Sequence, residues 1–180
     1  MAEFQLSDSV VLRSLKPEDA DELYDLIDAD RPQLARWMPW AGTQTPEGTR
    51  EFIRTAIKQE RDANGFQVAL VRAGAIAGVL GFHGIDRENA STTLGYWLAS
   101  ESQGRGLMSA AVNLLIDHAF ERWNLHRVEI RAAPDNHRSR ALAKRLGFHE
   151  EGVLRGAERW GEEYRDLVSY SLLATDPRPR

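Results

Sequence analysis

The chain has 180 residues, a formal net charge of −4 at pH 7 and no cysteine. A chain of this length can bury one full hydrophobic core, and the lack of cysteine excludes disulfides, thiolate metal ligands and a cysteine nucleophile. The negative charge gives no overall field to attract nucleic acid or an anionic membrane, and no apolar run approaches the roughly 18 residues of a membrane-spanning helix.

The N-terminal third predicts one strand and two helices. Residues 10–15 alternate between apolar and polar types, as a strand does. A helix is expected to begin at Pro17, where proline and acidic residues suit the first turn. A second helix is expected after the cap residue Thr45. The segment between them, residues 31–42, has no regular period and is predicted to be irregular.

Three antiparallel strands are expected next. Residues 65–71 alternate with period two, Ala73-Gly74 is a tight-turn signal, and residues 76–85 form a second apolar run, so the pattern predicts a hairpin. After a polar turn, residues 94–99 form the third strand. This strand leads directly into a glycine-bearing turn.

The turn Gln103–Met108 precedes a long apolar-periodic run that predicts a helix to about Trp123. A dinucleotide-binding fingerprint would need a third glycine where Ser109 stands, and no Gly-Lys-Ser/Thr sequence of a P-loop occurs. The glycines instead predict a turn whose backbone N–H groups, from Gly104 to Ser109, face a phosphate-bearing ligand. The alternative is a surface turn with glycines for geometry alone.

The last third predicts a strand, a helix and a hairpin. Residues 127–132 should pair in parallel with residues 94–99, because a helix lies between them. A short helix over 136–146 is ended by Gly147, and residues 153–160 and 164–173 form the hairpin. We therefore expect an α+β fold with a mostly antiparallel sheet and one parallel pair.

Two motifs together resemble the GNAT superfamily of acyl-CoA-dependent N-acetyltransferases. They are Gln103-Gly104-Arg105-Gly106-Leu107-Met108 and Asn136-x-x-Ser139 with Leu146-Gly147-Phe148 downstream. Three further segments are similar to the RimJ/RimL branch, which acetylates the N-termini of ribosomal proteins. These segments are Trp37-Met38-Pro39-Trp40, Gly95-Tyr96-Trp97-Leu98 and Glu151-Gly152. The resemblance implies a GNAT fold of about seven strands and about four helices, with the parallel pair splayed apart.

The resemblance also implies the reaction and its site residues. The enzyme would move an acetyl group from the cosubstrate acetyl-CoA to a primary amine, foremost the N-terminal α-amine of a ribosomal protein. Ser139 and Glu158 would be catalytic, as proton donor to the thiolate and as base, and Trp37 and Trp40 would line the acceptor groove. Cofactor contacts would come from Leu98, Gln103, Gly104, Arg105, Gly106, Leu107, Met108, Ser109, Asn136 and Ser139.

The chemistry of an α-amine fits a modest catalytic base. With a reference pKa near 8, about a tenth of an α-amine is neutral at pH 7, whereas a lysine is neutral at below about 0.1%. A backbone N–H near Leu98 would hold the oxyanion in the reaction that the resemblance implies. His83 is a second candidate for the base.

Each site residue also has a purely structural interpretation. Ser139 could support its helix, Asn136 could be an N-cap, and Glu158 could be an ordinary solvated carboxylate. The two tryptophans could be packing residues, and His83 could face solvent.

Two other functions stay open at this point. One is acetylation of a small-molecule amine, and the other is a non-catalytic acyl-CoA-binding regulator. We expect one domain over residues 8–175 with a fraying tail over 176–180, in the cytoplasm and able to form a homodimer. No signal peptide, metal, direct nucleic-acid partner or membrane is expected.

Overall fold

The computed structural model describes residues 2–179, which form one eight-stranded sheet. The strand order is β1-β2-β3-β4-β5-β6-β8-β7. The strands are β1 (Glu3–Ser7), β2 (Val10–Ser14), β3 (Gln67–Arg72), β4 (Ala75–Asp86), β5 (Ser91–Leu98), β6 (Arg127–Ala132), β7 (His149–Trp160) and β8 (Glu163–Leu173). The expected α+β class with a largely antiparallel sheet is confirmed, and β1 is a strand that the pattern did not predict.

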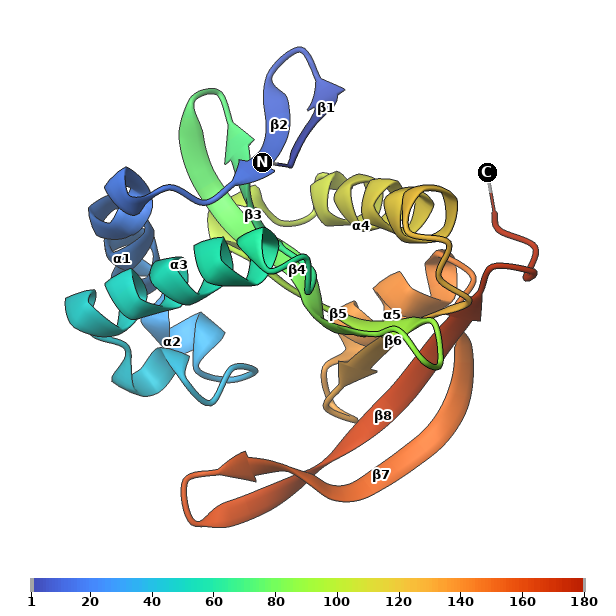
Figure 1. Cartoon of the computed structure of the whole chain (residues 1–180). Helices are drawn as coiled ribbons and strands as arrows, with labels where there is room; N and C mark the ends of the chain where they lie inside the picture. The colour runs from blue at the N-terminus through green and yellow to red at the C-terminus, as the bar shows by residue number, and fades with distance from the viewer. Residues whose placement is uncertain (1, 180) are drawn as a thin grey trace.

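Within residues 2–179, five α-helices cover the sheet. They are α1 (Ala20–Ala29), α2 (Arg31–Leu34), α3 (Pro46–Arg61), α4 (Leu107–Asp117) and α5 (His137–Arg145). Figure 1 shows α1, α2 and α3 on one face of the sheet and α4 and α5 on the other. The helix count differs from the expected four because a single turn, α2, interrupts the irregular segment. A π-helical turn over His118–Arg122 follows α4 and takes the helical run to its expected end near Trp123.

The central strands are buried on both faces because each face packs against helices. In β3, Val68 and Leu70 join the core beneath α4 and α5, whereas Ala69 and Val71 join the core beneath α1 and α3. Period-two alternation therefore divides one strand between two apolar layers. In β5 the same alternation sends Leu94 and Leu98 to the first layer and Trp97 to the second.

The predicted parallel pairing of β5 and β6 is confirmed, but the predicted span is not, because the pairs involve residues 91–93, which precede the expected strand over 94–99. Strand β5 pairs with β6 only through Ser91–Thr93 and residues 127–129, after which the two strands part. The opposite edge of β6 pairs with β8 along all six of its residues, from Arg127 to Ala132. Strand β6 is thus held firmly on one side and leaves a gap on the other.

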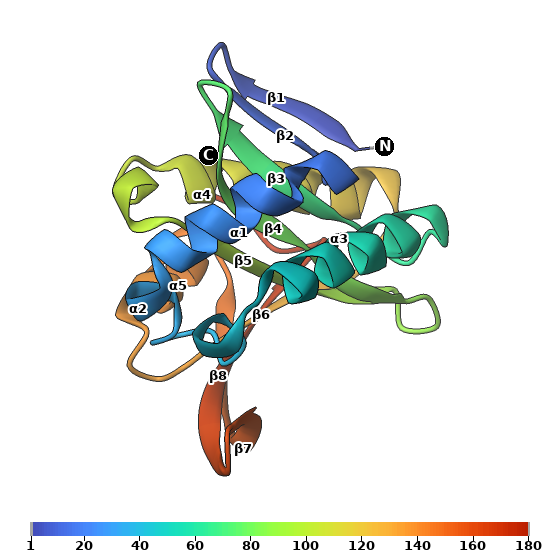
Figure 2. The same cartoon turned by 90° about the vertical axis from the view of Figure 1, so that its left-hand side faces the viewer.

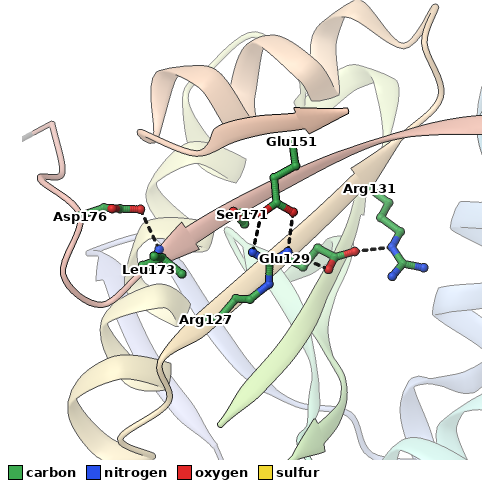
Figure 3. A network of polar contacts seen from close by, with 7 residues as sticks. All are labelled: Arg127, Glu129, Arg131, Glu151, Ser171, Leu173 and Asp176. Atoms are coloured by element: carbon green, nitrogen blue, oxygen red, sulfur yellow. Dashed lines mark hydrogen bonds and ion pairs between the residues drawn. The ribbon is translucent and has the colours of Figure 1, made fainter. Parts of the chain in front are cut away.

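A polar network reinforces the firmly held edge of β6 (Figure 3). Arg127 donates to both oxygens of Glu151 on β7, at 2.7 and 2.6 Å, and to Glu129 at 3.2 Å. Ser171 on β8 donates to Glu151 at 2.9 Å, and Arg131 pairs with Glu129. These charge-assisted bonds lower the pKa of Glu151 to about 2.

Strands β7 and β8 form the predicted hairpin, and its far end projects from the body of the molecule (Figures 1 and 2). Irregular pairing between Leu154 and Glu158 bends it. Val153, Leu154 and Tyr164 are exposed large apolar side chains on this hairpin.

The remaining expectations concern the second helix, the tail and the membrane. Thr45 accepts a hydrogen bond from Gly48 N–H at 3.0 Å, so the predicted cap of α3 is confirmed. The expected frayed tail ends at Arg180, which lies outside the described residues, and within it Arg178 pairs with Asp117. No helix in residues 2–179 is both long and apolar enough to cross a bilayer.

Candidate active site

The turn after β5 presents a row of free backbone N–H groups. Gly104 and Gly106 both have φ of +75°, a left-handed conformation that favours glycine. The first intrahelical bond of α4 runs from Ala110 N–H to Gly106 C=O at 3.1 Å. The N–H groups of residues 104–109 have no hydrogen-bond acceptor within residues 2–179, and we call this row of donors the cradle. A Cβ at either glycine would meet no atom within 4 Å, so the space in front of this cradle is open.

The charges around the cradle suit an anion. A helix N-terminus favours anions through its free donors and its dipole. Arg138 donates to Gln103 Oε1 at 2.6 Å and Arg145 donates to Ser109 Oγ at 3.1 Å, which brings two guanidinium groups to the turn that already carries Arg105. None of these three arginines has an ion-pair partner within residues 2–179.

Two other basic residues of the same region are already neutralised. Lys144 lies 2.9 Å and Arg140 lies 3.5 Å from the same carboxylate oxygen of Glu150. The sequence alone does not distinguish these two cations from the three arginines, because a tertiary ion pair leaves no sign in the local pattern. The structure distinguishes the two cations that form ion pairs with Glu150 from the three arginines that lie at the turn.

Two of the expected cofactor residues use their side chains within the protein. Gln103 Nε2 donates to the C=O of Leu98 at 2.8 Å, so with Arg138 on its other end Gln103 braces the turn against β5 and α5. The Met108 side chain is buried in the core below α4 and leaves the cradle clear. Leu107 and Ser109 flank it at the first turn of the helix, where their N–H groups are free.

The gap between β5 and β6 is lined by backbone groups. Ala99 N–H donates to Ala77 C=O at 2.8 Å, so these two residues form a hydrogen-bonded pair of the antiparallel ladder. Neighbouring pairs alternate, and therefore the N–H of Leu98, which lies opposite Gly78, points away from β4 and toward the gap. Tyr96, two residues earlier, has the same orientation. An amide-bearing chain lying in the gap could pair with these groups as an added strand would.

Helix α5 brings Ser139 into contact with a side chain of β5. Asn136 Oδ1 accepts the N–H of Ser139 at 3.1 Å, so Asn136 has the N-cap geometry that was its structural alternative. The Ser139 hydroxyl lies 2.8 Å from the hydroxyl of Tyr96, across 43 positions of sequence. Burial raises the pKa of Tyr96 to about 12, against smaller opposing effects of the Ser139 hydrogen bond and the Arg145 charge.

Glu158 lies apart from Ser139, on the projecting hairpin and opposite Arg165. Partial burial raises the pKa of its carboxyl, and the charge of Arg165 opposes that rise. Within residues 2–179 it forms no hydrogen bond or ion pair, either with Ser139 or with any other group. A half-buried carboxylate with free lone pairs and a raised pKa has the properties of a base, and no contact joins it to the other candidates.

Trp40 lies near the end of β5, against Trp97 and on the face opposite Tyr96. The rings of Trp40 and Trp97 make an edge contact with centroids 6.2 Å apart, and 38% of Trp40 is exposed. Trp37 is half-buried, with the guanidinium of Arg36 5.7 Å from its ring centre. Trp40 therefore combines packing with an accessible aromatic surface.

An open groove of about 380 Å³ lies where β5 and β6 begin to pair, and His83 and Glu129 line it. The His83 ring packs over Gly95, where an added Cβ would come within 2.2 Å of Nε2. Desolvation lowers the pKa of His83, so its imidazole is neutral at pH 7.

Sequence reasoning gave no individual role to Tyr96 or Trp97. The available signal was the period-two order of the strand, which places Tyr96 with Leu94 and Leu98 on one face and Trp97 on the other. That signal gives the face of a side chain but not its partner, because Ser139 and Trp40 come from distant segments.

Comparison with known proteins agrees with this arrangement. The family model of the acetyltransferase (GNAT) domain matches residues 9–149. A Bacillus subtilis (strain 168) protein named "Putative ribosomal N-acetyltransferase YdaF" is 36% identical over 173 residues, covering 94% of this chain and 93% of its own length. The ribosomal-protein-serine acetyltransferase of Escherichia coli (strain K12) is 29% identical over 170 residues, covering 94% and 95%.

A solved structure extends the likeness to three dimensions. The Microcin C7 self immunity acetyltransferase MccE, in complex with acetyl-CoA and AMP, superposes with a TM-score of 0.89 and 30% sequence identity. The superposition covers 93% of this chain and 94% of that one. The family match ends at His149, so it includes the cradle, the parting strands and Ser139 but not Glu158.

Proposed function

This chain belongs to the GNAT acetyltransferase family, and we propose that the amine it acetylates is the N-terminal α-amine of a ribosomal protein. It is an acetyl-CoA-dependent N-acetyltransferase with the GNAT fold. The observation that carries the proposed use of this site concerns β5. This strand diverges from β6 and then leads into α4, whose first N–H groups are free.

On this proposal the donor lies along the parting strands. The N–H groups of residues 104–109, with Arg105 beside them, bind the pyrophosphate of acetyl-CoA. The pantetheine arm pairs with backbone groups of β5 in the gap, and Asn136 at the start of α5 borders the arm. The free donors, the unpaired arginines and the open space at both glycines support this placement.

In the proposed reaction the amine nitrogen attacks the thioester carbonyl carbon. Leu98 N–H donates to the carbonyl oxygen as negative charge develops on it. The carbon–nitrogen bond forms and the carbon–sulfur bond breaks, leaving the electron pair on sulfur, which takes the proton of the Ser139 hydroxyl. Ser139 then regains a proton from water. Glu158 takes the proton that the nitrogen loses, directly or through one water.

The names of the relatives and the exposed aromatic surface near the end of β5 support a protein N-terminus as acceptor. Two of the relatives carry ribosomal acetylation in their names. Trp37 and Trp40 would form one wall of an acceptor groove, since both side chains are partly exposed and Trp40 contacts Trp97 near the end of β5. A small-molecule amine is the second candidate, favoured by the likeness to a self immunity acetyltransferase crystallised with AMP.

The test uses the whole protein with acetyl-CoA and measures thiol release. Peptides with the N-terminal sequences of ribosomal proteins are compared with the same peptides blocked at the α-amine, and with a panel of small amines. Release with free but not blocked peptides is the expected result. Turnover with small amines alone would overturn the protein acceptor, and CoA binding without turnover would favour a non-catalytic binder.

The proposal extends to the whole molecule and its setting. The acetyltransferase domain spans residues 8–175 and acts in the cytoplasm, where ribosomal proteins are made, as a homodimer. Light scattering of the purified protein tests the dimer. Mass spectrometry of the host proteome with and without the active protein tests the target, through newly acetylated N-termini.

A further inference from the structure

The Ser139 hydroxyl is held by one side chain that the reaction described above does not use. The hydroxyl of Tyr96 lies 2.8 Å from Ser139 Oγ and 3.5 Å from the Ser139 carbonyl oxygen. Within residues 2–179 these are the only hydrogen bonds of the Tyr96 side chain. A partly buried hydroxyl on β5 is thus directed at one residue of α5.

Serine needs such a partner if its hydrogen is to point in one direction. A free hydroxyl rotates, and its hydrogen can turn to any nearby acceptor. The phenol of Tyr96 can donate to Ser139 Oγ and leave the serine hydrogen available for another acceptor. Hydrogen bonds in such a chain strengthen one another, so Ser139 becomes a better donor.

We propose that Tyr96 is a positioning residue that orients the Ser139 hydroxyl toward the sulfur of acetyl-CoA. The inference rests on the proposed role of Ser139 in the acetyl transfer. Tyr96 keeps its own proton throughout. Ser139 gives its proton to the sulfur as the carbon–sulfur bond breaks and the electron pair stays on sulfur, and Ser139 then regains a proton from water. The proton lost by the amine goes to the base, so no proton leaves the phenol.

Burial agrees with a tyrosine that does not ionise. The phenol has a pKa of about 12 because the surrounding protein penalises the phenolate. Tyr96 is therefore neutral across the pH range in which the enzyme would work, and it serves as a fixed donor.

The first test is Tyr96→Phe, which removes only the hydroxyl. We expect kcat to fall about 10-fold, the effect of one hydrogen bond in the transition state, with the KM for acetyl-CoA changed less than about 2-fold. Rates are normalised to the concentration of CoA-binding sites, so a partly unfolded population does not count. The pH profile of kcat should keep its shape. Loss of its basic limb would mean that Tyr96 itself supplies a proton, and would overturn the positioning role.

The second test combines Tyr96→Phe with Ser139→Ala. Because Tyr96 acts through Ser139, the double variant should be no slower than Ser139→Ala alone. Equal 10-fold losses in both backgrounds would overturn the inference. An unaffected Ser139→Ala would instead refute the proposed role of Ser139, so the two failures are distinguishable.

Tyr170→Phe is the matched control. Tyr170 is fully buried, and its hydroxyl binds Arg140 of the same helix α5 at 2.8 Å but does not contact Ser139. The control should lose stability and keep kcat. A kcat loss in Tyr170→Phe as large as in Tyr96→Phe would show that the effect comes from anchoring α5, and would contradict a specific role for Tyr96.

Discussion

The region proposed to bind acetyl-CoA presents mainly backbone groups, whereas the region proposed to bind the acceptor presents side chains. The first, from β5 into α4, offers backbone N–H groups on regular elements, braced by Gln103 and backed by the core. The second consists of half-exposed side chains on an irregular segment and on a projecting hairpin, Trp40 and Glu158 among them. Backbone donors suit a ligand that is the same in every reaction, whereas exposed side chains suit one that varies between enzymes.

The largest effect should come from a bulky residue in the backbone region. In Gly106→Val a β-branched side chain must adopt φ of +75°, or move the turn that holds the N–H groups. We expect the affinity for CoA, measured by calorimetry, to fall on the order of 100-fold. Gly74→Val is the control, since Gly74 has φ of +86° and open space but lies in the β3–β4 turn. Equal losses in the two variants would contradict the cradle.

Glu158→Gln tests the acceptor region through both rate and stability. We expect kcat to fall roughly 10- to 100-fold, the usual contribution of a general base. In the parent enzyme the acid limb of kcat should lie above the pH expected for an ordinary glutamate, because the pKa of Glu158 is raised by burial.

Glu158→Gln should lower the rate but should not lower the stability of the fold at pH 7. A raised folded-state pKa means that the protonated carboxyl suits the fold, so stability is full below the unfolded pKa and decreases as pH rises through the folded one. Glu158→Gln should therefore melt no lower than the parent at pH 7. Glu163→Gln, at an exposed position of the same hairpin, should change neither rate nor acid limb. A full rate in Glu158→Gln would remove this residue from the reaction.

Trp40→Ala should have a smaller effect, confined to the acceptor. Loss of its exposed aromatic surface should raise the KM for a peptide acceptor about 5-fold and leave the KM for acetyl-CoA unchanged. Steady-state kinetics with each substrate varied in turn makes the distinction. Phe52→Ala removes a comparably exposed aromatic side chain from α3 and should change neither constant.

The smallest effect should come from Glu151→Gln in the network of Figure 3. The pKa of Glu151 is lowered to about 2, so its contribution to stability is present above the unfolded value and is lost as pH falls toward 2. Because the Arg127–Glu151 ion pair is partly exposed, the melting temperature at pH 7 should fall by only about 2 °C. Thermal melts from pH 7 to pH 2 should show this difference shrink. If the difference in melting temperature between variant and parent stays constant with pH, the effect comes from packing and not from the charge of Glu151.

Local signals predicted the fold of the region that is proposed to bind acetyl-CoA through its backbone. Two glycines ahead of an apolar-periodic run are enough to indicate a helix with bare N–H groups, and the helix between β5 and β6 indicates their parallel pairing. Strand β1 was missed because it is a short edge strand whose side chains are mostly exposed, so its alternation carries little signal.

Tertiary contacts account for what local signals could not give. The Tyr96–Ser139 bond and the Trp40–Trp97 contact each join segments far apart in the chain. Glu150 neutralises Lys144 and Arg140 only after β7 has returned beside α5. Such pairings follow from the topology of the sheet, and no spacing along the sequence encodes them.

The short pairing of β5 with β6 also has a mechanical consequence. This β5–β6 seam, over residues 91–93 and 127–129, holds three residue pairs. By comparison, β6 forms six pairs with β8, and β5 forms seven pairs with β4. A force applied across the strands would therefore part the sheet at this seam first. A ligand that pairs with both sides of the gap would act as a clamp between the two halves of the molecule.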